Sequence, residues 1–391
     1  VLVVSGLAQN SDVFSAIGSA GTYKSGFSVT GNVVLDMTAQ GSTSARGFNI
    51  QYAEDFTLDC TIRSKGGAGN PVRILNARGA WYVRRVARKT TETAGSCVYL
   101  QATTDGHIHS VYADGGDEAL DLANCTGLVA DFVTGVNCGE PLDIGSSNAC
   151  QIGKVYGRNN SQGVNFKIDN GASATGCNAN HIDSITLEDM QTGVAAVTFS
   201  NAYGAGQTNA DNNVGAVYAR TTASNTRAVW FNGYDATYPI KRGRVGHVNF
   251  IGPEECVSYG KYTEGCHVGD ENSYYETTGN FAAISIAGSG TDAFTHYRPT
   301  VRGRVKATAR TGSGNGAVQI LKTDGQGQTV FDGHVLASGA EGIITYQSKN
   351  LRCAGTVEET ALSGLLIRVV DDANYGGHLN IRWRGTMKNI A

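Results

Sequence analysis

Proline, charge and long apolar runs are all scarce in this sequence. Of its 391 residues only 5 are proline, and charged residues make up 17%. The 31 basic and 34 acidic residues leave a formal net charge of −3, and no more than two basic residues are consecutive. Proteins that bind nucleic acid usually carry a strongly basic face, so no nucleic-acid partner is expected. No stretch approaches the roughly 18 apolar residues of a membrane-spanning helix, so no membrane insertion is expected either.

Sequence patterns for metal ligands and paired thiols are missing as well. The nine cysteines form no Cys-x-x-Cys motif and no Cys/His set at zinc-ligand spacing. Most are therefore expected to be small buried residues of a β core. Cys256 and Cys266 are close enough in the chain to bridge a loop if the protein is exported. The opening VLVVSGLAQ lacks the basic flank of a signal peptide and is expected to form a strand.

A short strand pattern, apolar–x–apolar, recurs along the whole chain at intervals of roughly 20 to 35 residues, which is typical of solenoid repeats. The triplets end at Ile50, Ile74, Leu100, Leu122, Ile144, Phe166, Phe199, Phe231, Tyr259, Ile286, Ile320, Tyr346 and Val369. Each interval holds a second apolar strand, such as the one marked by Ile108 and Val111. Gly, Asn, Asp, Ser and Thr clusters lie between the strands and are typical of turns, whereas the 3.6-residue period of helices is nearly absent.

This repeat predicts an all-β protein, a right-handed parallel β-helix of about thirteen coils in a single solenoid. A leucine-rich repeat would show helical segments, and a propeller would need four strands per repeat. No linker interrupts the pattern, so one domain is expected over residues 1–391, with room for flanking modules outside them. Coils lengthen after Phe166, and insertions at a repeated turn usually build the wall of a groove.

The middle residue of each triplet is expected to point outward, because side chains alternate along a strand. In chain order these residues are Asn49, Arg73, Tyr99, Asp121, Asp143, Asn165, Thr198, Trp230, Ser258, Ser285, Gln319, Thr345 and Arg368. In a parallel β-helix they form one column along the axis, with neighbours about 4.8 Å apart.

Two carboxylate pairs occupy neighbouring coils of this column. The motifs Glu118-Ala-Leu-Asp121 and Glu140-Pro-Leu-Asp143 are offset by the length of one coil, so the register stacks Glu118 on Glu140 and Asp121 on Asp143. Like charges at that spacing repel and push some pKa values upward. The alternative is a set of solvated turn carboxylates, but a purely structural solenoid has no need of such a repulsive cluster. These four residues are the candidate catalytic groups.

Candidate substrate-binding residues flank the carboxylates. Arg73 and Tyr99 precede them in the column, Asn165 and Lys167 follow on the next coil, and Trp230 lies farther along. Aromatic faces with interspersed amides suit stacking on sugar rings. The part of the column from Arg73 to Trp230 spans about 29 Å at the usual strand spacing, which is room for an oligosaccharide.

With this architecture and the carboxylate motifs of segment 114–169, the sequence resembles the pectin-lyase-like superfamily of β-helical polysaccharide-degrading enzymes, including bacteriophage tailspike depolymerases. The resemblance implies an extracellular protein, secreted or carried on a virion, with a polysaccharide substrate and a homotrimeric assembly. It covers nearly the whole chain as architecture and only this segment as motif. Cys138-Gly139-Glu140 stands where polygalacturonases carry Gly-His-Gly, and Phe166-Lys167 only half matches their Arg-x-Lys, which argues against polygalacturonate as substrate.

An endo-acting glycoside hydrolase without a cofactor is the predicted function. Hydrolysis needs one protonated and one ionised carboxyl group beside the scissile bond, and mutual repulsion within the cluster supplies both. Asp121 and Asp143 are the expected core pair, with Glu118 and Glu140 as the other acid or base candidates. Direct neighbours fit the retaining separation of about 5–5.5 Å, and a diagonal pair such as Glu118 and Asp143 fits the inverting range of about 6.5–9.5 Å. The resemblance favours the diagonal.

Two alternatives stay open at this point. In a polysaccharide lyase the same carboxylates would hold Ca²⁺, and Lys167, Arg158 or Tyr99 would remove the proton from a uronate. In a non-catalytic spike or adhesin the column would bind a glycan without cleaving it, and the carboxylate cluster would not be needed.

Overall fold

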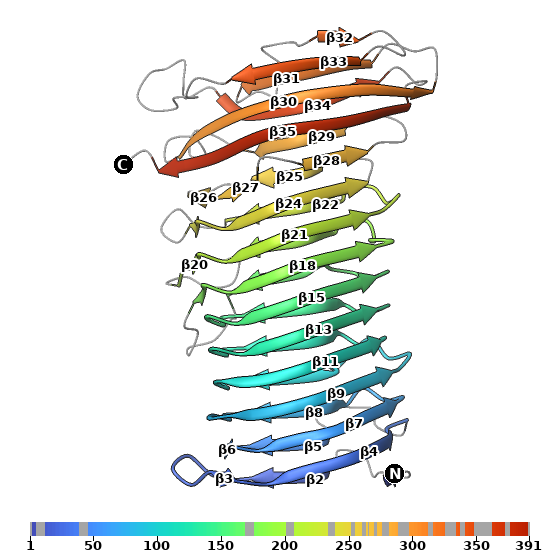
Figure 1. The fold of residues 1–391 in the computed structure, drawn as a ribbon, viewed down its shortest axis with the longest axis vertical. Helices are drawn as coiled ribbons and strands as arrows, with labels where there is room; N and C mark the ends of the chain where they lie inside the picture. The colour runs from blue at the N-terminus through green and yellow to red at the C-terminus, as the bar shows by residue number, and fades with distance from the viewer. Residues whose placement is uncertain are drawn as a thin grey trace. The chain divides into compact units, whose positions relative to one another are not determined.

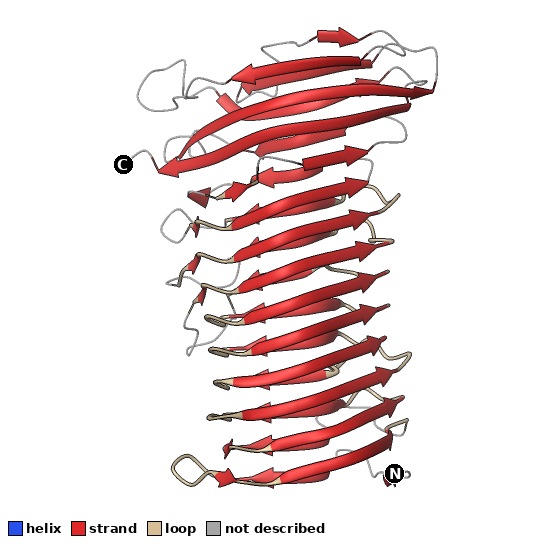
Figure 2. Ribbon diagram, in the orientation of Figure 1, coloured by secondary structure: helices blue, strands red, loops and turns tan. Residues whose placement is uncertain are grey.

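The protein is described from a computed structural model. The structure describes residues 2–4, 12–38, 46–168, 176–200, 207–233, 239–251, 255–259, 263–264, 266–269, 272–275, 281–287, 297–311, 316–324, 334–336, 341–347, 362–371 and 376–389. Strands and turns account for all of this part of the chain, which contains no helix (Figure 2). A helical membrane span is thus not found among the described residues. The chain divides into two compact units, Val1–Thr186 and Leu187–Ala391.

The first unit consists mainly of two parallel sheets whose strands alternate along the chain (Figure 1). One sheet contains, in spatial order, β1 (Leu2–Val4), β4 (Ser28–Asp36), β7 (Thr57–Lys65), β9 (Trp81–Lys89), β11 (Gly106–Asp114), β13 (Val129–Val136) and β15 (Gln151–Arg158). The other contains β2 (Asp12–Ile17), β5 (Arg46–Gln51), β8 (Asn70–Leu75), β10 (Val98–Gln101), β12 (Glu118–Ala123), β14 (Glu140–Gly145) and β16 (Val164–Lys167). Each coil adds one strand to each sheet, so the predicted parallel β-helix is confirmed.

Shorter strands lie at the corners of the first unit. β3 (Lys24–Ser25) pairs with β6 (Ala53–Glu54) in parallel. Single bridges connect Thr104, Thr126, Asn148 and Asn178 on successive coils, the last of them in β17 (Cys177–Asn178). β18 (His181–Glu188) contains the division between the units.

The apolar residues of the triplets form the core of the first unit, as the pattern predicts. Leu120 and Leu122 on β12 and Leu142 and Ile144 on β14 are fully buried. Stacked aromatic rings continue the core, since Phe56 lies between Phe27 and Trp81 with ring centroids 5.0 and 5.6 Å apart. Burial of such side chains stabilises the stacking of one coil on the next, at about 25 cal/mol per Å² of apolar surface removed from water.

The chain turns through a left-handed residue after most strands of the sheet of β2 to β16. Ala102, Asn124 and Ser146 have φ values of 51°, 56° and 46° and follow β10, β12 and β14. Asparagine tolerates this conformation well, and alanine less so. The repeated turn keeps successive coils in register, which places equivalent side chains above one another.

The second unit begins with the same strand alternation. β19 (Ala195–Ser200), β22 (Arg227–Asn232), β25 (Glu255–Tyr259) and β29 (Phe281–Ala287) pair in parallel. β24 (Arg244–Ile251) pairs in parallel with β21 (Asn213–Arg220), β27 (His267–Val268) and β28 (Asn272–Tyr275). A small parallel sheet contains β20 (Asn209–Ala210), β23 (Ile240–Lys241) and β26 (Thr263–Glu264).

The last part of the second unit pairs in the opposite sense. β30 (Tyr297–Thr311), β33 (Glu341–Gln347) and β35 (Gly376–Asn389) pair antiparallel, as do β31 (Gly316–Asp324), β32 (His334–Leu336) and β34 (Leu362–Asp371). The triplets ending at Ile320, Tyr346 and Val369 lie in these antiparallel strands, so the expected count of about thirteen stacked coils is not confirmed. Apolar alternation has a period of two in both kinds of sheet and therefore does not reveal strand direction.

The cysteines of the described side chains are buried thiols that form no disulfide. These are Cys60, Cys97, Cys125, Cys138, Cys150, Cys177 and Cys266. The expectation of small buried core residues is confirmed for these seven. The suggested bridge between Cys256 and Cys266 is wrong, because Cys266 keeps its thiol, which lies 3.6 Å from the Ile240 carbonyl oxygen.

Candidate active site

The two carboxylate pairs lie on adjacent parallel strands in the predicted register. Glu118 pairs with Glu140 and Asp121 with Asp143 along β12 and β14. Ala119 and Leu120 are consecutive buried residues, so the strand does not alternate strictly between Glu118 and Asp121. This irregularity allows residues three apart in a strand to reach the same face, which strict alternation would forbid.

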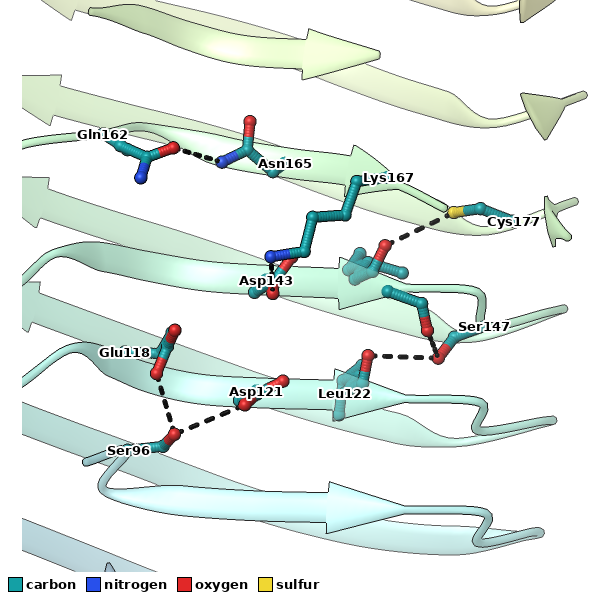
Figure 3. Close-up of polar contacts among 12 residues, drawn as sticks. Ser96, Glu118, Asp121, Leu122, Asp143, Ser147, Gln162, Asn165, Lys167 and Cys177 are labelled. Atoms are coloured by element: carbon teal, nitrogen blue, oxygen red, sulfur yellow. Dashed lines mark hydrogen bonds and ion pairs between the residues drawn. The ribbon is translucent and has the colours of Figure 1, made fainter. Parts of the chain in front are cut away.

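A hydroxyl group connects the two carboxylates of β12. Ser96 Oγ donates to Glu118 Oε2 at 2.8 Å and lies 3.4 Å from Asp121 Oδ2 (Figure 3). The two carboxylate oxygens therefore lie no farther apart than these two distances laid end to end. A pair of oxygens this close is compatible with the separation of about 5–5.5 Å between the carboxyl groups of a retaining pair.

The glutamates of both strands hold protons near neutral pH. Burial, together with the charge of Asp117, raises the pKa of Glu118 from 4.5 to about 7, while the Ser96 hydrogen bond acts in the lowering direction. Burial also raises the pKa of Glu140 to about 7, against the opposing influence of Lys167. The cluster thus contains carboxyl groups that keep their protons where ordinary carboxylates are ionised, which is the property of a general acid.

A lysine neutralises the deepest carboxylate. Lys167 reaches from β16 so that its Nζ lies 2.5 Å from Asp143 Oδ2 (Figure 3). The Asp143 side chain is 5% exposed and the Lys167 side chain 27%. An ammonium group at this distance favours the ionised form of a carboxyl group. The cluster therefore combines the Asp143–Lys167 ion pair with two glutamates whose pKa values are raised.

The four predicted catalytic residues differ in how far they are exposed. Glu140 and Asp143 are 4% and 3% exposed, whereas Glu118 and Asp121 are only half-buried. An outward-facing position in the triplet therefore does not by itself make a side chain accessible. The pair on β12 is therefore the more accessible one, and the pair on β14, on the neighbouring strand, is nearly inaccessible.

The nearest predicted substrate-binding residues occupy the same column. Arg73 pairs with Tyr99, Tyr99 with Asp121, and Asp143 with Asn165. Arg73 is half-buried, and burial followed by the charge of Arg46 lowers its pKa. Asn165 Nδ2 donates to Gln162 Oε1 at 3.2 Å. The expected line of polar and aromatic side chains beside the carboxylates is thus present on β8, β10 and β16.

Trp230 belongs to the second unit. It lies on β22, where it pairs with Thr198 and Ser258. The Arg227 guanidinium carbon lies 4.9 Å from the centre of its ring, a cation–π contact. A role for Trp230 in substrate binding stays a prediction.

The residues around Asp143 do not form an evident calcium site. Ca²⁺ takes six to eight oxygen ligands, and here the Lys167 ammonium contacts Asp143 in the position of a cation. No group of three or more His, Cys, Asp or Glu side chains in the described part of the chain is arranged to hold a metal ion. The Ca²⁺ of the lyase alternative stays a prediction without a matching ligand set among these residues. Arg158, one of the bases suggested for that alternative, lies at the end of β15 in the other sheet.

Ser96 and Gln162 were not among the residues predicted from sequence. Ser96 precedes Glu118, and Gln162 follows Glu140, by the same interval that separates the two glutamates. Extending this interval by one coil in each direction would have identified both residues. Arg88, which is buried behind this region, carries no such signal, because it lies on β9 of the other sheet.

No protein-family model matches the chain, and no curated protein matches it. Among solved structures, the chain is similar to the Gp54 tailspike of Acinetobacter baumannii bacteriophage AP22, solved in complex with A. baumannii capsular saccharide. The TM-score is 0.36 at 10% identity, over 92% of this chain and 68% of that one.

A second similar structure is the tailspike protein gp49 of A. baumannii bacteriophage Fri1, a capsular polysaccharide depolymerase. Its TM-score is 0.27 at 10% identity, over 93% of this chain and 69% of that one. At these TM-scores neither likeness supports a conclusion about activity, which has to come from the residues of this chain.

Proposed function

We propose that this protein is a polysaccharide-degrading glycoside hydrolase that cleaves within glycan chains. The observation that carries the proposal is the Glu118–Asp121 pair, in which one hydroxyl holds two accessible carboxylates close together. Burial raises the pKa of Glu118 to about 7, so this carboxyl group is protonated in about half of the molecules at neutral pH. One protonated and one ionised carboxyl group at short range are the minimal equipment for glycosidic bond cleavage.

In this proposal Glu118 is the general acid. Its proton goes to the glycosidic oxygen as the bond to the leaving sugar breaks, and Asp121 stabilises or attacks the positively charged sugar carbon. The short separation that the shared Ser96 contact imposes fits attack by Asp121 and retention of configuration. The diagonal pair of Glu118 and Asp143 is the inverting alternative, with Asp143 activating a water molecule.

The buried carboxylates support the proton on Glu118. Asp143 lies among the charges that raise the pKa of Glu118, and Glu118 in turn raises that of Glu140. Ionised Asp143 thus opposes ionisation of Glu118. Lys167 limits the total repulsion by its contact with Asp143. The lysine is accordingly a poor proton-abstracting base for a lyase, because a carboxylate at this distance favours the protonated ammonium.

The substrate follows from the rest of the column. Tyr99 and Asn165 flank the carboxylates, and Arg73 lies two strand spacings from Asp121, about 10 Å. Such a row of side chains suits successive sugars of a long glycan. Polysaccharides of this kind lie outside cells, so we place the protein there, secreted or on a virion. The homotrimer implied by the sequence resemblance is retained as a prediction, which sedimentation equilibrium would test.

The test is digestion of a panel of acidic and neutral polysaccharides by the wild type and the Asp121→Asn and Asp143→Asn variants, with and without a chelator. New reducing ends, no ultraviolet absorbance from an unsaturated uronate, and indifference to the chelator are expected. Both variants are expected to lose activity while keeping the wild-type circular dichroism spectrum. Unsaturated products would support the lyase instead, and binding without cleavage would support the non-catalytic spike. The anomer released first separates retention from inversion.

A further inference from the structure

A buried arginine lies behind the carboxylate pair of β12. Arg88, on β9, is 1% exposed. Its Nη2 donates to the carbonyl oxygens of Gly67 at 2.8 Å and Ala94 at 3.0 Å, and its Nη1 donates to that of Gly95. These three hydrogen bonds offset part of the cost of burying the guanidinium, whose Nε has no hydrogen-bond partner in the described part of the chain. The planar fork of the two Nη atoms fixes the three carbonyl acceptors in a defined geometry. The backbone at Ala94 and Gly95 is therefore held at the base of the site.

The next residues are tied to the strand that carries the acid. Asp117 N donates to Gly95 O at 3.1 Å, and Cys97 N donates to Glu118 O at 2.8 Å. Ser96 lies between these two backbone hydrogen bonds and is 5% exposed. Its hydroxyl group consequently has a fixed position relative to Glu118.

A glycine allows this close approach. Gly116 has φ +101°, and a Cβ atom there would lie 2.8 Å from Arg88 Nη1 and 2.9 Å from Gly95 O. Both distances are shorter than real Cβ contacts, so only glycine permits the arginine, the Gly95 carbonyl and the start of β12 to pack together. Gly116 thus allows the close packing that holds the segment containing Ser96 against β12.

We propose that Ser96 is a positioning residue, which holds Glu118 and Asp121 as a pair and sets the pH at which Glu118 loses its proton, and that Arg88 acts through Ser96 by fixing residues 94–96. The consequence for catalysis rests on the proposed function, but the effect on the Glu118 carboxyl group does not. The Ser96 hydroxyl donates to Glu118, and such a bond favours the ionised carboxylate.

The charged groups around Glu118 come from four strands and one turn. Asp117 precedes it, Asp121 lies on its own strand, Glu140 and Asp143 lie on β14, Lys167 lies on β16, and Arg88 acts from β9. Asp117, Asp143 and burial oppose ionisation, whereas Lys167, Arg88 and the Ser96 hydroxyl favour it. Ser96 is neutral, unlike these charged groups. Removing its hydroxyl group therefore changes the titration of Glu118 without changing the net charge.

The test is a carboxyl ¹³C NMR titration of the full chain labelled at glutamate, with Glu118 assigned by comparison with Glu118→Gln. In the wild type the pKa of Glu118 is expected near 7. In Ser96→Ala it is expected to rise to about 8 or above, as one hydrogen bond to a charged group is lost. Ser96→Thr retains a hydroxyl group and is expected to restore the wild-type titration. A Glu118 pKa that is unchanged or lower in Ser96→Ala would overturn the proposal.

Ser64 provides a matched control. It lies on β7, is 6% exposed, and its Oγ has no hydrogen-bond partner in the described part of the chain. Ser64→Ala therefore removes a buried serine hydroxyl without removing a contact to a carboxylate, and the Glu118 titration is expected to stay as in the wild type. The same rise in both alanine variants would assign the effect to general loosening and overturn the role of Ser96.

The part played by Arg88 is tested with Arg88→Lys, which keeps the charge and loses the fork of donors. This variant is expected to raise the Glu118 pKa when Ser96 is present and to have little further effect in Ser96→Ala, because coupled residues are not additive. Equal effects in both backgrounds would show that Arg88 does not act through Ser96. Should Arg88→Lys fail to fold, the titrations of Ser96→Ala and Ser96→Thr still decide the proposal for Ser96.

Catalysis provides a separate readout. With any polysaccharide that the wild type cleaves, the alkaline limb of the pH profile of kcat/KM is expected to shift to higher pH in Ser96→Ala, by the same amount as the Glu118 pKa measured by NMR. In Ser96→Thr it is expected to return to the wild-type position. A panel in which the wild type cleaves nothing would count against the proposed function alone, because the NMR titration needs no substrate.

Discussion

The Lys167 ammonium lies 2.5 Å from the Asp143 carboxylate, across the pairing of β14 with β16. Asp143 is nearly inaccessible, whereas Lys167 retains about a quarter of its exposure. The pair therefore combines a desolvated anion with a cation that reaches toward solvent. Removing only the cation would leave the anion buried without a partner.

Removing one charge of this pair is expected to destabilise the protein more than replacing both residues by apolar ones. Lys167→Met leaves an uncompensated carboxylate in a buried place and is expected to lower the free energy of unfolding by about 3 kcal/mol. The double variant Asp143→Leu/Lys167→Met removes both charges and is expected to recover most of that loss. Denaturant unfolding measures both. A double variant less stable than Lys167→Met would contradict the burial of an isolated charge as the cause.

Removing the proposed acid is expected to abolish cleavage without unfolding the protein. Glu118→Gln keeps the shape of the side chain and the acceptor for Ser96 but cannot donate the carboxyl proton, so kcat is expected to fall by about 10²–10⁴-fold. Initial rates of reducing-end release measure this. Glu54→Gln is the control, because Glu54 pairs with the exposed Arg78. This variant is expected to leave the rates unchanged. Wild-type rates in Glu118→Gln would exclude it as the acid.

The raised glutamate pKa values predict a stability that falls as pH rises. Both Glu118 and Glu140 have pKa values near 7 in the folded chain against 4.5 ordinarily, so between these pH values the folded chain binds protons that the unfolded chain has released. Their stabilising contribution is complete below pH 4.5 and is lost as pH rises through 7. Between pH 5 and 8, Tm is expected to fall less steeply with pH in Glu118→Gln/Glu140→Gln than in the wild type. An equal slope in both proteins would contradict the assignment of the pH dependence to these two glutamates.

Arg73 is expected to bind substrate rather than take part in bond cleavage. Arg73→Met is expected to raise KM by about 10-fold or more with kcat nearly unchanged, as a uniform binding contact is lost. The matched control is Arg84→Met on β9, where the exposed arginine pairs with Asp59 at 3.4 Å. Steady-state kinetics on the cleaved glycan compare the two. A fall in kcat at constant KM in Arg73→Met would instead place Arg73 at the reacting bond.

The buried thiols are expected to be inert in the folded protein. Burial raises the pKa of Cys97 and Cys150 to about 12 and that of Cys60 and Cys138 to about 11, and only thiolates react rapidly with disulfide reagents. In a Cys256→Ser/Cys353→Ser variant, thiol labelling is expected to be negligible until denaturant is added. Rapid labelling of the native variant would show that the coils open readily.

Strand positions and the register of the carboxylates were predictable from sequence. The apolar triplet and the constant offset between the two carboxylate motifs follow from a coil that must return each buried side chain to the same place, so Glu118 had to pair with Glu140 and Asp121 with Asp143. Strand direction near the C-terminus was not predictable, because the apolar–x–apolar triplets that end at Ile320 and Val369 are the same whether β31 and β34 run parallel or antiparallel.

The sequence by itself determined the repeat, the inward column of apolar residues and the outward column that contains Asp121 and Asp143, since these depend only on spacing along the chain. Tertiary structure decided which of the four carboxylates are accessible. Lys167 from the following coil lies against Asp143, while Ser96 from the preceding coil holds Glu118 and Asp121 (Figure 3). These contacts depend on the direction in which each long side chain turns and on how closely glycines let the coils approach, and neither is set by the position of a residue in the repeat.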